Sequence, residues 1–317
     1  MQSIGGYFSL ELPVEDEYYK NAVRLNTGRN CLEYILLSHR YRKIYIPYYT
    51  CEVILEPFHK LGIEYSFYHV DTKLEVADNI TLLSDEALLY TNYYGLKQHY
   101  VEKLVHKYGS RLIIDNTQAF YAKPFAGVDT FNTCRKFFGV PDGAYLFTDH
   151  ILNIDIEKDQ SFERMTFLTK RIDVSAEAAY SDFREESNGL IGNPIRKMSV
   201  LTHRLMCSID YEKVAEQRRN NYRHLHNALA ESNLLKLNMV ESAVPMVYPY
   251  WVDRGKKLRD KMISHKVFIA RYWPNVFDWC QPTDWEYQLT ENLVCIPIDQ
   301  RYGKDEMDFI IDMILHD

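Results

Sequence analysis

Lys136 is the residue whose type and setting could do covalent chemistry. It lies in the segment Asn132 to Tyr145, NTCRKFFGVPDGAY, three positions after Thr133 and directly before two phenylalanines and a proline-aspartate-glycine turn. Apolar neighbours partly desolvate a lysine, and desolvation favours the neutral amine. A neutral amine can attack an aldehyde to form a Schiff base. Lys136 could also be an ordinary surface lysine at the beginning of a turn, which is the commoner case, and this segment alone leaves both interpretations open.

Polar residues follow three short apolar segments that have the composition of buried strands. The segment RLII leads into Asp115 and Gln118, ALLYT leads into NYYG at 92–95, and VDTF leads into the segment that carries Lys136. The carboxyl ends of parallel strands meet at one edge of a sheet, where ligands bind in α/β proteins. We therefore expect these three groups to converge, although each by itself is also an ordinary polar loop.

The start of a predicted helix in LNTGRNCLEYILLSHR could bind an anion. Asn26 or Thr27, followed by Gly28, marks the helix start, and Arg29 occupies the first turn in place of an acidic residue. A cation and free backbone N–H groups at the N-terminus of a helix suit a phosphate. An ordinary capped helix would have the same local sequence.

The order of the predicted elements indicates an α/β fold with a mainly parallel sheet. Apolar strand segments alternate with segments of helical periodicity, which is typical of βαβ units buried on both faces. We expect strands at 43–47, 64–70, 87–91 and 111–114, with helices at 51–61 and over VEKLVHKYG.

The second half of the chain has a different texture, mostly helical and charged after Asp149. The glycine-proline break NGLIGNP at 188–194 predicts a division into a large domain, residues 1–192, and a smaller α+β domain, residues 193–317. In the smaller domain the apolar segments VYPYW, KVFIARYW and LVCIPI alternate with short helices. The N-terminal segment IGGYFSLEL could be an arm across an active-site mouth or a frayed end with one edge strand.

Composition restricts the class of protein. The 317 residues carry a formal net charge of -7, which argues against nonspecific nucleic-acid binding. We find no apolar run long enough for a membrane span and no secretory signal. Six cysteines are dispersed without CxxC pairs, so we expect reduced thiols, no metal site and a cytoplasmic protein.

With these positions assembled, the sequence resembles the DegT/StrS family of sugar aminotransferases. These are pyridoxal-phosphate (PLP) enzymes with the aspartate-aminotransferase fold (fold type I), and the likeness is densest from Asn26 to Tyr145. NTCRKFFGVPDGA resembles the Schiff-base lysine segment of the family, which gives Lys136 the catalytic position. RLIIDNTQAF resembles the strand end where an aspartate pairs with the pyridine nitrogen and a glutamine lies by the ring, and these positions are Asp115 and Gln118.

The resemblance also implies how the rest of the cofactor is held. The helix start resembles the family's phosphate cradle, and IPYYTCEVI resembles the segment whose residue after the threonine stacks on the ring. RKMSVLTHR resembles the stretch where a loop of the partner subunit reaches the phosphate. The further cofactor positions implied are Thr27, Gly28, Arg29, Asn30, Cys51, Thr133 and Asn193.

This sequence departs from the family at two cofactor positions. Cys51 stands where an aromatic residue usually stacks on the ring, and Phe131 stands where a serine is common, five residues before the lysine. Thr133 is a plausible substitute phosphate ligand. The segment DNTQ replaces the commoner DAAQ.

The activity that the resemblance implies is transfer of an amino group, commonly from glutamate, to a keto sugar attached to a nucleotide. Candidate residues on the acceptor side are Tyr7, Tyr94 and Arg196, and a homodimer with shared sites is expected. A catalytically degenerate relative acting as a binding or scaffold protein in a polysaccharide pathway is the alternative. An unrelated nucleotide-binding α/β enzyme would need a glycine-rich phosphate loop, and neither GxGxxG nor GxxxxGK[ST] occurs.

Overall fold

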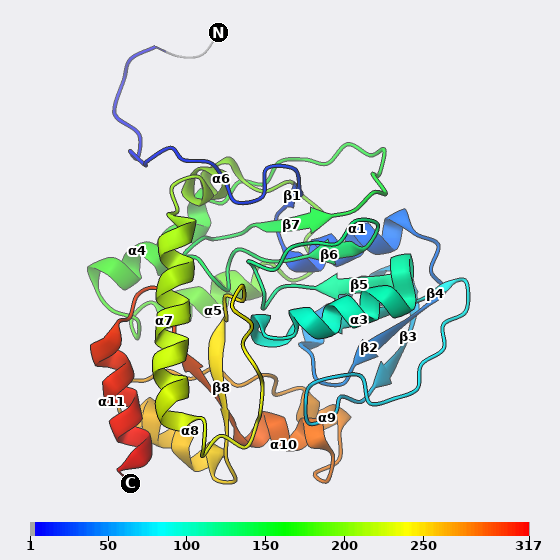
Figure 1. Cartoon of the computed structure of the whole chain (residues 1–317). Helices are drawn as coiled ribbons and strands as arrows, with labels where there is room; N and C mark the ends of the chain where they lie inside the picture. Colours follow the sequence, from blue (N-terminus) through cyan, green and yellow to red (C-terminus); the bar gives the residue numbers. More distant parts are fainter. Residues whose placement is uncertain (1–3, 317) are drawn as a thin grey trace.

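A computed structural model of the chain describes residues 4–316, and its centre is a seven-stranded sheet (Figure 1). The strand order is β1-β7-β6-β5-β4-β2-β3, in which β2 to β6 run parallel and β7 runs antiparallel to both of its neighbours. The mainly parallel α/β sheet predicted from the sequence is confirmed. The strands are β1 (Val23–Leu25), β2 (Lys43–Pro47), β3 (Glu64–Tyr68), β4 (Glu86–Thr91), β5 (Leu112–Asp115), β6 (Asp129–Phe131) and β7 (Ala144–Phe147).

Successive residues of the central strands face two separate apolar cores. In β4, Ala87 and Leu89 join the core formed with helices α1 (Gly28–Ser38) and α2 (Leu55–Leu61), whereas Leu88 and Tyr90 join the core on the other face. That second core includes Val101 of α3 (Gln98–Tyr108) and continues into the C-terminal part of the chain. Burial on both faces explains why these strands are continuous apolar runs.

The remaining helices belong to the second half of the chain. The helix α7 is the longest and packs against both α11 and β8, beside the large sheet (Figure 1). These elements are α4 (Thr166–Asp173), α5 (Tyr180–Asn188), α6 (Val200–Met206), α7 (Tyr211–Leu229), α8 (Gly255–Ser264), α9 (Val276–Trp279), α10 (Trp285–Asn292) and α11 (Lys304–Leu315), with β8 (Val247–Trp251) and β9 (Leu293–Pro297). In the described part of the chain, four short 3-10 helices, η1 to η4, cover Glu52–Ile54, Tyr93–Gly95, Gly109–Arg111 and Phe162–Met165.

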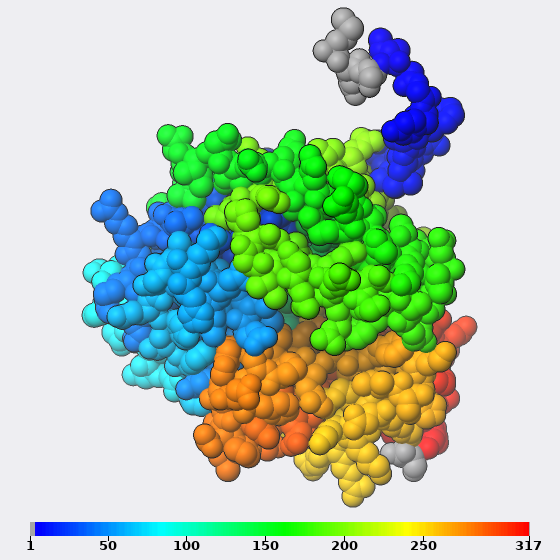
Figure 2. Space-filling view, turned by 180° about the vertical axis from the view of Figure 1, so that it is seen from behind, coloured from blue at the N-terminus to red at the C-terminus, as the bar shows by residue number. Residues whose placement is uncertain are grey.

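A second, two-stranded sheet forms in the C-terminal part from β8 and β9, which pair antiparallel. Two of the three apolar segments expected there are therefore strands. The third, KVFIARYW, forms no strand; Ile269 and Trp273 are buried in the core without a β partner. Seen from behind, this C-terminal part lies below the first half of the chain (Figure 2). The division at 192/193 stays a prediction.

The first described residues of the chain extend away from the body of the molecule (Figure 1), whereas Glu17, Tyr19 and Ala22, shortly before β1, are buried against it. Ile4, Tyr7 and Phe8 are almost fully exposed, and no strand forms there. The edge strand expected in this segment is therefore wrong, and an arm across an active-site mouth stays a prediction. Within residues 4–316, no helix is long and apolar enough to cross a membrane, and no cluster of side chains could hold a metal ion.

Candidate active site

Lys136 lies in a tight turn between β6 and β7. The N–H groups of Phe137 and Phe138 both donate to the carbonyl of Cys134, at 3.1 and 2.9 Å, and the Cys134 N–H donates to the carbonyl of Gly143 at 2.9 Å. The two phenylalanines pack into the core, so they do not cover the amine. Lys136 is exposed in the single chain, and the expectation of a partly desolvated lysine is wrong for this state.

The amine of Lys136 and the carboxylate of Asp115 are linked through one side chain. Lys136 Nζ donates to Thr117 Oγ1 at 3.0 Å, and the Thr117 backbone N–H donates to Asp115 Oδ1 at 2.8 Å. Asp115 is the last residue of β5 and is 6% exposed. Burial raises its pKa, while the positive charge of Lys136 and the hydrogen bonds from Thr117 oppose that rise and favour the carboxylate.

The start of α1 approaches this pair because it begins with a glycine. A Cβ on Gly28 would lie 3.2 Å from Thr117 Cγ2 and 3.5 Å from the Asn132 carbonyl. Thr27 caps the helix by accepting the Asn30 N–H at 3.1 Å. The Gly143 N–H donates to the Asn26 carbonyl at 2.6 Å, which ties the helix start to the turn that carries the lysine.

The long side chains at this helix start are engaged within the chain. Arg29 donates to Glu56 Oε2 at 2.7 Å and to the Leu190 carbonyl at 2.9 Å. The Asn30 amide donates to Glu33 Oε2 at 3.0 Å and to the Asn193 carbonyl at 3.2 Å. An anion at this helix start would therefore meet the first backbone N–H groups of the helix, which have no partner inside it.

Gln118 brings an unpaired donor to the same sheet edge. Its side chain is fully buried, its Oε1 accepts the Tyr94 N–H at 3.0 Å, and its Nε2 has no hydrogen-bond partner among the described residues. Cys51 lies close enough for the charge of Lys136 to act on its thiol, whose pKa is raised by burial and lowered in part by that charge. An unpaired buried amide is costly in a folded protein, which indicates a missing partner at this position.

The other candidate residues have their own partners. Thr133 Oγ1 donates to the Gly143 carbonyl at 3.3 Å, and the Asn193 amide donates to the Gly189 carbonyl at 2.7 Å. Tyr94 is fully buried and shares a 3.0 Å hydrogen bond with the Tyr49 hydroxyl. Tyr7 lies on the exposed arm, and the structure does not bring it to Lys136.

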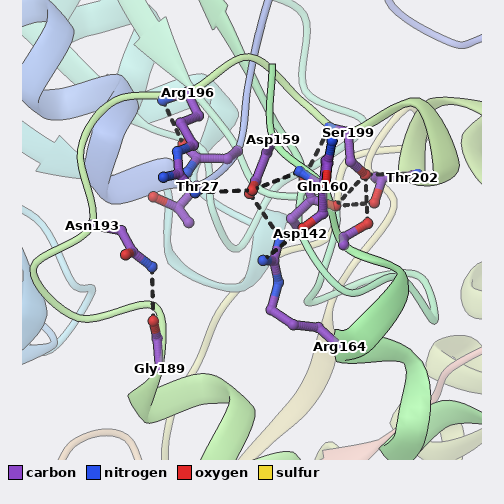
Figure 3. A network of polar contacts seen from close by, with 12 residues as sticks. Thr27, Asp142, Asp159, Gln160, Arg164, Gly189, Asn193, Arg196, Ser199 and Thr202 are labelled. Atoms are coloured by element: carbon purple, nitrogen blue, oxygen red, sulfur yellow. Dashed lines mark hydrogen bonds and ion pairs between the residues drawn. The ribbon is translucent and has the colours of Figure 1, made fainter. Parts of the chain in front are cut away.

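Arg196 borders the helix start. Its carbonyl accepts the Asn26 N–H at 2.9 Å, and its guanidinium donates to Asp159 Oδ1 at 3.4 Å (Figure 3). Asp159 also accepts from Arg164 at 2.7 Å, so its carboxylate joins two arginines. Roles of Arg196 and the other candidates toward a ligand stay predictions.

A buried polar network that the sequence did not indicate holds the turn after Lys136. The carboxylate of Asp142 accepts from the N–H and the hydroxyl of Ser199, at 3.0 and 2.9 Å, and from the hydroxyl of Thr202 (Figure 3). Asp142 is fully buried, and burial raises its pKa. In the sequence, Pro-Asp-Gly indicated only a turn, because its partners lie about 60 residues further along.

Two further side chains of the C-terminal part contact the lysine turn at a backbone carbonyl. The Phe137 carbonyl accepts from Gln300 Nε2 at 2.8 Å and from Arg218 Nη2 at 3.3 Å. Arg218 is 2% exposed, donates otherwise to carbonyl and amide oxygens, and burial lowers its pKa to about 10. A cavity of about 590 Å³ opens here, lined among others by Lys136, Arg171, Tyr180, Arg218, Tyr272 and Arg301.

Comparison with known proteins identifies the fold. No family model matches the sequence, and no curated protein matches it. Among solved structures, a DegT/DnrJ/EryC1/StrS aminotransferase from Brucella abortus matches at a TM-score of 0.59 and 13% identity, over 92% of this chain and 84% of that one. A sugar aminotransferase from Micromonospora echinospora matches at 0.58 and 14% identity, over 92% and 86%. NtdA from Bacillus subtilis, with bound cofactor PMP, matches at 0.62 and 13% identity, over 95% and 73%.

The chain has the fold of these aminotransferases. The fold type I architecture predicted from the sequence resemblance is thereby confirmed. In this fold Lys136 and Asp115 lie at one edge of the sheet, as the motifs led us to expect, and their connection through Thr117 was missed. The only signal for Thr117 in the sequence was the replacement of DAAQ by DNTQ.

Proposed function

We propose that this protein is a PLP-dependent aminotransferase that transfers an amino group to a keto sugar. The observation that carries the proposal is the chain of contacts Lys136–Thr117–Asp115 at the carboxyl edge of a parallel sheet. A primary amine and a buried carboxylate side by side are the two groups that a pyridine aldehyde requires. The aminotransferase fold supports the same conclusion.

The described residues fit this cofactor. The unpaired Nε2 of Gln118 offers a donor at the buried edge, and the missing Cβ of Gly28 lets the helix start approach Thr117 and Asn132. The phosphate would be held by the first N–H groups of α1, with Thr27 and Thr133 nearby. Asp115 would pair with the pyridine nitrogen, and Cys51 would lie in place of a stacking aromatic ring.

When bound, the cofactor supplies an electron sink for a carbanion at the substrate's Cα. Burial raises the pKa of Asp115, while Lys136 and Thr117 oppose that rise and favour the carboxylate, which would pair with a protonated pyridine nitrogen. Lys136 would hold the cofactor through its Nζ, and the same Nζ, when free, would act as the base for the substrate's Cα proton.

The substrate proposal rests on the cavity beside Lys136 and on the activity named for the similar structures. Arg171, Arg218 and Arg301 line this cavity, and Asp299 is the acidic side chain in its wall. We propose glutamate as amino donor and a nucleotide-linked keto sugar as acceptor, in cytoplasmic biosynthesis of a surface polysaccharide or related product. Tyr94 and Arg196 remain proposed contacts of the acceptor. Tyr7 could contribute only if the N-terminal segment reaches the active site of a partner subunit.

We also propose a homodimer in which Asn193 reaches the cofactor phosphate of the partner subunit. Helices α4 and α5 have no buried residue of their own, and large apolar side chains around them are exposed. Ile172, Val174 and Tyr180 are exposed by 85, 65 and 60%. Contiguous exposed apolar side chains are typical of protein interfaces.

The half-reaction with glutamate tests the activity. Wild-type protein loaded with PLP should convert glutamate to 2-oxoglutarate, with loss of the visible absorbance of the bound aldehyde form. Asp115→Asn should bind the cofactor and lose most of this activity, because an amide cannot keep the pyridine nitrogen protonated. Cofactor binding without any half-reaction, with glutamate or other amino donors, would favour a catalytically degenerate binding protein. Full activity in Asp115→Asn would contradict the role of the carboxylate.

A further inference from the structure

Thr117 occupies the position between the two groups on which the proposed chemistry depends. Its hydroxyl accepts from Lys136 Nζ at 3.0 Å, and its hydrogen bonds to Asp115 help to keep that carboxylate ionised. Among residues 4–316, Thr117 is the side chain to which Lys136 is hydrogen-bonded. An exposed lysine side chain is otherwise free to sample many rotamers.

The orientation of the Thr117 hydroxyl is fixed by its surroundings. The backbone N–H of Thr117 is bonded to Asp115 Oδ1 at 2.8 Å, which holds the residue directly after the strand end. Its methyl group faces Gly28, where a Cβ would lie only 3.2 Å away. With the methyl against the helix start, the hydroxyl is directed to Lys136, and β-branching leaves few alternative rotamers.

We infer that Thr117 is a positioning residue that holds the amine of Lys136 beside Asp115 whenever that amine is free. The catalytic value of this positioning rests on the proposed function, in which the amine of Lys136 would be free before the cofactor binds and again while the substrate amine occupies the cofactor. While this hydrogen bond holds the amine, fewer of its orientations are open to an external electrophile. The family's commoner segment DAAQ has alanine at this position, and alanine has no hydroxyl with which to hold the amine.

The test measures Lys136 in the cofactor-free protein. Competitive labelling with acetic anhydride, followed by mass spectrometry, gives the reactivity of Lys136 relative to the exposed Lys73 in the same sample. Thr117→Val keeps the shape and removes the hydroxyl, and it should raise the relative labelling of Lys136 at pH 7 by about five- to tenfold. Thr117→Ser keeps the hydroxyl and should restore the wild-type value.

A matched control separates this effect from a general loss of structure. Thr130→Val makes the same change on the neighbouring strand β6, where the hydroxyl is buried and donates only to the Val128 carbonyl, and it should label as wild type does. Equal labelling of Lys136 in Thr117→Val and wild type would overturn the inference. If Thr117→Val does not fold, Thr117→Ala takes its place with the same expected rise.

The experiment is independent of the proposed function, because it contains no cofactor. Failure of wild-type protein to bind PLP would remove the proposed aminotransferase activity and leave the labelling result standing. Unchanged labelling in Thr117→Val, together with normal cofactor binding, would remove the inference and leave the proposed activity standing.

Discussion

Replacing Gly143 by alanine should destabilise the fold and disturb the turn that carries Lys136. Gly143 has a φ of +106°, and a Cβ there would lie 2.8 Å from Thr202 Cγ2 and 3.2 Å from Cys134 Sγ. The Thr202 side chain cannot easily withdraw, because it is fully buried and its hydroxyl is bonded to Asp142. The unfavourable φ costs about 1–2 kcal/mol, and overpacking adds about 1–3 kcal/mol, so we expect a loss of about 3 kcal/mol.

Urea denaturation followed by circular dichroism measures this loss, and Gly127→Ala is its control. Gly127 also has a positive φ, +71°, but a Cβ there would meet no atom within 4 Å. Gly127→Ala should therefore show the backbone part alone, about 1 kcal/mol. Because the Gly143 carbonyl accepts from both Thr133 and Cys134, Gly143→Ala should also weaken cofactor capture. Equal destabilisation in the two variants would refute the packing argument.

Three further predictions concern other parts of the chain. Gln300→Glu places a carboxylate oxygen against the Phe137 carbonyl, so kcat should fall about tenfold. The control is Gln288→Glu: the wild-type Gln288 amide donates to a carbonyl away from the lysine, so this variant should leave kcat unchanged. Burial raises the pKa of Asp115 above the ordinary 3.8, so the native state binds a proton on this carboxyl more tightly than the unfolded chain does. Proton binding at Asp115 therefore stabilises the fold below pH 3.8, and this stabilisation is lost as the pH rises through the native pKa. Urea titrations at several pH values should show this loss in wild type and not in Asp115→Asn, and the same loss in both would contradict it. Ile172→Glu, on the exposed apolar side of α4, should shift a dimer to monomer in sedimentation equilibrium, and an unchanged dimer would place the interface elsewhere.

The sheet was predictable because its strands are apolar runs of the right length with clear breaks between them. ALLYT and RLII became β4 and β5, and their register sets Thr91 beside Asp115 at the carboxyl edge. KVFIARYW is also rich in apolar residues without forming a strand, since a strand needs a partner in register and this segment has none. Composition alone carries no information about pairing.

The positions of Lys136 and Asp115 were predictable from motif order, whereas their surroundings were not. Apolar residues next to Lys136 in sequence led us to expect a covered amine, but Phe137 and Phe138 turn into the core and leave the lysine outside. The contact with Gln300 was also missed, because it lies 163 residues away in the sequence. Long-range hydrogen bonds of this kind leave no local pattern.

Covalent trapping of the cofactor is the most direct test of the account. Pure protein is incubated with PLP, reduced with borohydride, digested and examined by mass spectrometry. We predict a reduced phosphopyridoxyl group on the peptide that contains Lys136, and loss of both this adduct and the visible absorbance in Lys136→Ala. A cofactor that attaches to other lysines equally well, or a variant that retains the full absorbance, would contradict the assignment of Lys136 as the lysine that binds PLP.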